Sequence, residues 1–235
     1  MAAPVFYARP EVVGGMLNVQ PALASWDRVG SPGQVRSAAF VAAVHLAIAE
    51  QLRVTPDPLA LRLDIGLPDT VAQRAVNDLD NYLFPLVPKL TEGTGRQFAS
   101  VWATKRHAAT SSVAVCQAAT VHDPGGAYSF QVQTTASAST TAYKHQIHEQ
   151  ISAARPLPDG GIDLQLAFVV GARRAWPNLW KATIDSLGPI LGYDAGAREW
   201  NPRDGRIVDL GLHCVLDPAV GSQVVIAIRA RTLDQ

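Results

Sequence analysis

The sequence has no excess of charge of either sign. Its 235 residues include 20 lysines and arginines and 20 aspartates and glutamates, so the formal net charge is zero. A neutral chain does not attract nucleic acid or an anionic membrane through its overall field, and such binding would need a local basic patch. This balance weighs against a nucleic-acid role without excluding one.

Cysteines and long apolar runs are also scarce. Cys116 and Cys214 lie far apart in apolar stretches, and they are too few and too scattered for a disulfide framework or a thiolate zinc site. No uninterrupted apolar run reaches the roughly 18 residues of a membrane-spanning helix, and the N-terminus lacks the basic and apolar regions of a signal peptide. We therefore expect a cytoplasmic protein without membrane association, with both thiols buried and reduced.

The two halves of the chain repeat one order of predicted elements. At 48% hydrophobic and 17% charged residues, the composition is that of a soluble globular protein. Helical apolar spacing predicts helices at 37–53 and 140–155, and alternation predicts strands at 59–67 and 162–168. Each half reads as strand, helix, strand, helix and two strands, which indicates a tandem repeat.

A pair of aspartates lies just ahead of a predicted helix in the first half. Residues 77–81 read Asn-Asp-Leu-Asp-Asn, which places Asp78 and Asp80 two positions apart. Such a pair can direct both carboxylates into one pocket, where Mg²⁺ takes oxygen ligands. Capping of the helix by Asp80 or Asn81, with Asp78 favouring the same end of the helix dipole, explains the same residues without a metal.

These residues resemble a known family. Residues 77–81 resemble the Asp-Leu-Asp-Asn motif with which RusA-type Holliday-junction resolvases open a helix. Residues 178–187 are similar to the continuation of that helix, and 202–210 are similar to the family's acidic loop and following strand. The resemblance covers the core of both halves and leaves 9–36 unexplained.

The resemblance implies a fold. RusA-type enzymes are small homodimers, so a single chain with two such halves would be a fused version of the dimer. We therefore expect an α+β fold of two RusA-like repeats, 1–122 and 123–235, each a small mixed β-sheet with packed helices. Together they would form an intramolecular pseudo-dimer that is monomeric in solution.

Each half keeps only part of the family motif. The first half has both motif aspartates but carries Phe84 at the position of the family's lysine and lacks the acidic loop residue. The second half has Lys181 and Asp204 for those two roles, but Ala175 and Pro177 replace the motif aspartates. The complementary losses indicate one composite site, although decay of both sites would leave the same pattern.

The resemblance also implies an activity. It points to a Mg²⁺-dependent endonuclease that acts on branched or junction DNA, with Asp78, Asp80 and Asp204 as metal ligands. Lys181 would stabilise charge on the reacting phosphate. In a composite site the carboxylates of Asp80 and Asp204 should approach within roughly 6 Å.

Other functions remain open for the same residues. Asp204 in Arg-Asp-Gly suits a plain turn. The alternative to an active nuclease is a catalytically inactive RusA-like protein that binds DNA or a protein partner, or that serves only assembly.

Four basic residues flank the proposed site and are candidates for DNA binding: Lys105, Arg106, Arg173 and Arg174. They could hold phosphates if they share one face with the carboxylates. A solvated charged edge is the alternative for each of them.

Overall fold

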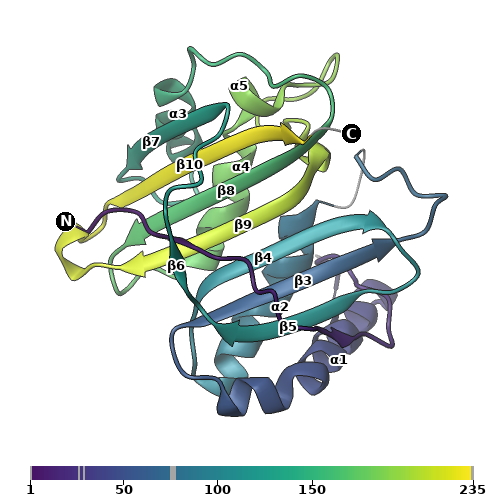
Figure 1. The fold of residues 1–235 in the computed structure, drawn as a ribbon. Coiled ribbons are helices and arrows are strands. Elements are labelled where there is room, and N and C mark those ends of the chain that lie inside the picture. The colour runs from purple at the N-terminus through teal and green to yellow at the C-terminus, as the bar shows by residue number, and fades with distance from the viewer. Residues whose placement is uncertain (1, 26, 29, 75–77, 234–235) are drawn as a thin grey trace.

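The chain forms one mixed β-sheet with helices on one face, an α+β fold (Figure 1). The computed structural model describes residues 2–25, 27–28, 30–74 and 78–233. The eight strands follow this spatial order: β2 (Gly15–Met16), β5 (Ser112–Gln117), β3 (Leu59–Leu67), β4 (Phe98–His107), β9 (Ile207–Leu216), β8 (Gly161–Val170), β10 (Val224–Leu233) and β7 (Tyr128–Thr134).

The helices lie behind the sheet in the view of Figure 1, and the N-terminal segment crosses in front of it. The helices are α1 (Pro32–Val54), α2 (Leu79–Thr94), α3 (Thr141–Gln150), α4 (Trp180–Asp185) and α5 (Gly188–Leu191). Short 3₁₀ turns are η1 (Trp176–Leu179), η2 (Asp204–Arg206) and η3 (Pro218–Val220). In front of the sheet, β1 (Phe6–Tyr7) pairs with β6 (Thr120–Val121).

The pairing pattern is the same on both sides of the sheet centre. β3 pairs in parallel with β4 and antiparallel with β5, while β8 pairs in parallel with β9 and antiparallel with β10. β4 and β9 then pair antiparallel and join the two units. The expectation of a separate small sheet in each half is therefore corrected, because the strands that would have been exposed edges pair with each other.

Helix α1 begins earlier than its apolar spacing predicts. Ser31 caps it by accepting a hydrogen bond from the Gln34 amide, and Pro32 occupies the first turn, where its missing N–H costs nothing. Ser37, the first residue of the predicted helix, lies inside α1.

Helix α1 is also long and apolar enough to cross a membrane by length and composition alone. Core helices of globular proteins pass the same test. Its apolar stripe packs in the main core, formed by residues four apart: Phe40, Val44, Ile48 and Leu52. This packing is typical of a soluble globular protein.

Pro85 and Pro88 in the sequence predict that helix α2 is short or kinked. The structure shows that α2 is not short, because it continues through both prolines. Pro85 cannot donate to the carbonyl of Asn81, and the backbone N–H of Ala24 donates to that carbonyl instead at 2.8 Å. The loss of one helical hydrogen bond is thus compensated by a segment far away in sequence. This contact also attaches the chain around Ala24 to the first turn of α2.

The front face of the sheet buries polar groups under the N-terminal segment. Phe6 and Tyr7 lie against the ring of His213, and the Ser100 hydroxyl lies 3.1 Å from His213 Nδ1. Burial lowers the pKa of His213 to about 3, so this imidazole is neutral. Both cysteines are free, and Cys214 is buried as expected while Cys116 is only half-buried.

The core contribution of α1 can be tested with two neighbouring aliphatic residues. Ile48→Ala should lower the free energy of unfolding by about 2 to 5 kcal/mol, because Ile48 is fully buried. Leu46→Ala, on the exposed face of the same helix, should change it by less than about 0.5 kcal/mol. Urea unfolding followed by circular dichroism measures both, and equal losses would contradict the packing of α1.

Candidate metal centre

Three aspartates from distant parts of the chain meet at one end of the central strands. Asp78 and Asp80 stand at the start of α2, and Asp204 opens η2 immediately before β9. One carboxylate oxygen of each lies within 4.8 Å of the other two. The predicted approach of Asp80 to Asp204 is thereby confirmed, and their role as metal ligands stays a prediction.

Helix capping does not account for the first two carboxylates. Asp78 occupies the N-cap position, yet its side chain makes no capping hydrogen bond and instead accepts from the Asn81 side chain at 3.0 Å. Asp80 is only 3% exposed, and its Oδ2 has no hydrogen-bond partner within the described part of the chain. The neighbouring motif residue Asn77 lies outside the described residues.

Lys181 is the cation at the centre of this cluster. Its Nζ donates to Asp204 at 2.8 Å, and it also lies near three further carboxylates: Asp185 at 3.2 Å, Asp80 at 3.9 Å and Asp78 at 4.0 Å. Burial alone would lower the pKa of Lys181, but the carboxylates outweigh burial and raise it above its ordinary value. Lys181 therefore stays protonated, and its side chain remains 41% exposed.

Lys105 belongs to the same cluster and not to a surface patch. It is 2% exposed, and its Nζ donates to the carbonyl of Gly205 at 2.7 Å. Burial lowers the pKa of Lys105 to about 8, against the opposing effect of Asp78, Asp204 and Asp80. The structure places Lys105 beside the carboxylates because positions 101, 103 and 105 of β4 face the helices, as Val101 and Ala103 do. Its contact with DNA stays a prediction.

Burial also raises the pKa values of two of the carboxylates, Asp78 and Asp80. It raises the pKa of Asp80 to about 7, with Lys181 opposing the shift and Asp204 and Asp78 adding to it. The pKa of Asp78 is raised by burial and by the charge of Asp204. Because a proton competes for the Asp80 carboxylate, a divalent cation would bind more tightly as the pH rises and would release this proton when it binds.

Asp185 is part of the cluster and is absent from the predicted set. It receives a hydrogen bond from Lys144 at 2.6 Å in addition to its contact with Lys181. Lys181 and Asp185 stand four apart in α4, a spacing that places two side chains on one helical face. That spacing was the available signal in the sequence.

The three predicted arginines do not gather around the carboxylates. Arg106 is exposed next to Lys105, whereas Arg173 and Arg174 follow the far end of β8. Arg174 lines a cavity with Thr91 and other residues from the C-terminal end of α2. Asp80 stands near the opposite end of this 16-residue helix, about 17 Å from Thr91 along its axis.

A search against protein-family models and a search of curated proteins each found no match for this chain. The resemblance to RusA-type resolvases therefore depends on the motifs and stays a prediction. What the structure adds is the geometry of the acidic cluster.

The raised pKa of Asp80 predicts a pH-dependent loss of stability. The group binds its proton more tightly when folded, with a pKa of about 7 against an ordinary 3.8. The free energy of unfolding should therefore fall between about pH 4 and pH 7, by about 1.4 kcal/mol per unit where Asp80 titrates. Asp80→Asn should remove this fall, as measured by urea unfolding at about pH 5 and about pH 8 with EDTA.

Asp217→Asn serves as the control, because the pKa of Asp217 is shifted in the opposite direction to that of Asp80. Hydrogen bonds from the amides of Ala2 and Ala219 lower the pKa of Asp217, so its charged form stabilises the fold above its ordinary pKa. This variant should lose stability at about pH 8 and lose less at about pH 3. An Asp80→Asn profile parallel to that of the wild type would contradict the assignment.

Proposed function

We propose that this protein is a Mg²⁺-dependent endonuclease that cleaves branched DNA in the cytoplasm, through one composite site built from both halves of a monomeric chain. The observation that carries the proposal is the carboxylate of Asp80. Its Oδ2 is buried without a hydrogen-bond partner among the described residues, and an oxygen of the same group lies within 4.8 Å of oxygens from Asp78 and Asp204. A cation would supply the missing partner.

The donor set suits a hard divalent cation. All three ligand atoms are carboxylate oxygens, which Mg²⁺ prefers. Oxygens on one octahedral Mg²⁺ lie about 3 to 4.2 Å apart, given Mg–O distances of about 2.1 Å. Oxygens within 4.8 Å of one another need only small side-chain rotations to reach that arrangement.

The surrounding residues have separate roles in this proposal. Mg²⁺ bound there would orient a phosphodiester and neutralise the charge that builds up during its hydrolysis. Asp78, Asp80 and Asp204 would hold the ion. Lys181, partly exposed beside them, would contact the phosphate oxygens as a point charge, while Asp185 keeps its ammonium in place.

The second half supports the proposal of a duplicated, RusA-like frame with one surviving site. When Asn81 is aligned with Asn178, Asp78 and Asp80 correspond to Ala175 and Pro177, and Asp185 corresponds to Pro88. These three non-acidic counterparts line one cavity of about 370 Å³. The mirrored strand pairing and this cavity are what a pseudo-dimer of 1–122 and 123–235 would produce.

The alternative is an inactive relative that binds DNA or a protein partner. Two observations favour it. The Lys181 ammonium already pairs with Asp204 at 2.8 Å, and Arg173 and Arg174 lie at the far end of β8. Such a protein would bind branched DNA or its partner without metal-dependent cleavage.

Cleavage of a labelled four-way DNA junction tests the activity. The wild type should cut in Mg²⁺ and not in EDTA, and Asp80→Asn and Asp204→Asn should each lower the rate at least about a hundredfold, because a bound metal contributes several kcal/mol to such reactions. Asp217→Asn, just past the other end of β9, should cleave at the wild-type rate. A wild-type protein that binds the junction without cutting it would favour the inactive alternative.

Metal binding can be measured independently of cleavage. Mg²⁺ at about 100 times its dissociation constant should raise the free energy of unfolding by about 2.7 kcal/mol, because the ion binds the folded state alone. Thermal unfolding at about pH 8 should show this shift for the wild type and for Asp217→Asn. The shift should be absent in Asp80→Asn, and its persistence there would contradict the ligand assignment.

A further inference from the structure

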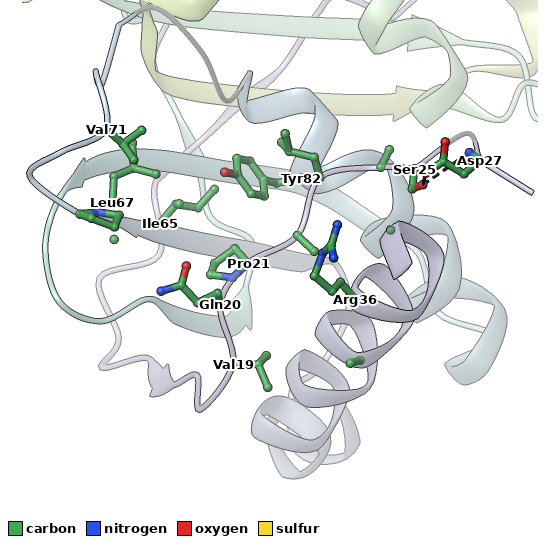
Figure 2. Close-up of a pocket in the computed structure, with 17 residues that line it drawn as sticks. Val19, Gln20, Pro21, Ser25, Asp27, Arg36, Ile65, Leu67, Val71 and Tyr82 are labelled. Carbon is green, nitrogen blue, oxygen red and sulfur yellow. Dashed lines mark hydrogen bonds between the residues drawn. The ribbon is translucent and has the colours of Figure 1, made fainter. Parts of the chain in front are cut away.

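A large cavity lies beside the acidic cluster. It has a volume of about 880 Å³ and lies between the segment around Pro21, the start of α1, the end of β3 and the first turn of α2 (Figure 2). This volume falls within the range of small-molecule sites. The cavity is formed largely by the part of the chain that the family resemblance leaves unexplained.

The cavity and the acidic cluster share the first turn of α2. Tyr82 lines the cavity two residues after Asp80. Burial raises the pKa of Tyr82 to about 12, and the charge of Asp78 adds to the shift, so hydroxyl and carboxylate are electrostatic neighbours. The hydrogen bond from Ala24 to Asn81 ties the outer wall to the same turn.

Among the described residues, the lining combines an apolar surface with the basic side chain of Arg36 and the acidic side chain of Asp27, which accepts a hydrogen bond from the Ser25 hydroxyl. Ile65, Leu67 and Val71 from the end of β3 and the following loop face Pro21 and the Tyr82 ring in Figure 2. The Arg36 side chain extends from α1 toward Tyr82 in the same view. Arg36 is exposed and has no hydrogen-bond or ion-pair partner in the described part of the chain. Such a lining suits a ligand with a flat apolar part and an anionic part.

We propose that this cavity receives one unpaired nucleotide of a branched DNA, with its base against the apolar wall and a phosphate on Arg36. The proposal rests on the proposed nuclease function, because the adjacent cluster would then act on a phosphodiester of the same strand. A paired base leaves its stack only at a cost of free energy, whereas a branch point offers a base that is already unpaired. The cavity thus selects branched over continuous duplex DNA.

The test is a binding comparison that requires no cleavage. Two three-way DNA junctions are used, one with an unpaired thymine at the branch and one with an abasic residue at that position. With Asp80→Asn as the parent, fluorescence anisotropy should show about tenfold tighter binding of the junction that carries the base. Adding Arg36→Ala or Ala39→Trp should reduce this ratio to about one, because the first removes the cation and the second fills the cavity.

Arg53→Ala is the matched control, because Arg53 is an exposed arginine at the other end of α1 that pairs with Glu50. Arg53→Ala should still bind the junction with the unpaired base about tenfold more tightly than the abasic junction. Equal affinity of the parent for both junctions, no binding to either, or an unchanged ratio in Arg36→Ala would overturn the proposal.

The outcome is separable from that of the nuclease proposal. If the cavity proposal fails alone, the wild type still cleaves junctions in Mg²⁺ while the base and abasic junctions bind equally. If the nuclease proposal fails alone, the tenfold ratio and its loss in Arg36→Ala persist while the wild type cuts neither junction.

Discussion

The antiparallel pairing of β4 with β9 is the constraint on which the rest of the structure depends. Its register runs from Ser100 opposite His213 to Thr104 opposite Asp209, and it sets the end of one strand beside the beginning of the other. Lys105 follows the last β4 residue that pairs with β9 by one position, which is why its side chain reaches the loop before β9. A slip of one residue would turn Lys105 to the opposite face and dismantle the cluster.

The cluster so formed is costly to maintain. Each charge removed from water carries a penalty of several kcal/mol, and an ion pair offsets it only where geometry and hydrogen bonding are good. Lys181 forms a close ion pair with Asp204, but its Nζ lies 3.9 Å from Asp80. The cost of burying the Asp80 charge is therefore only partly offset, and the pKa of Asp80 is raised. Carboxylates kept in one place at such a cost are typical of functional sites.

Local patterns in the sequence predicted much of the secondary structure. The pairing of strands that are far apart in the sequence could not be predicted from them. Strands β3 and β8 follow from alternation, and the buried stripe of α1 follows from helical spacing, because both depend on neighbours in sequence. The β4–β9 pairing joins residues that are more than a hundred positions apart, so no local pattern indicated one continuous sheet. The burial of Lys105 was hidden by the same limit, because the loop that accepts its hydrogen bond is a hundred residues away in sequence. The continuity of α2 was missed because Ala24, remote in sequence, replaces the donor that Pro85 lacks.

The difference between the two halves coincides with the position of the cluster. The first half carries a segment from β2 to the start of α1 that supports α2 and forms one wall of the large cavity. In the second half, η1 and the six-residue α4 precede β9, and neither carries an aspartate in its first turn. One half thus supplies the carboxylate-bearing helix and the cavity, and the other supplies Lys181 and Asp204. The cluster therefore depends on both halves, because neither half alone holds all of its charged side chains.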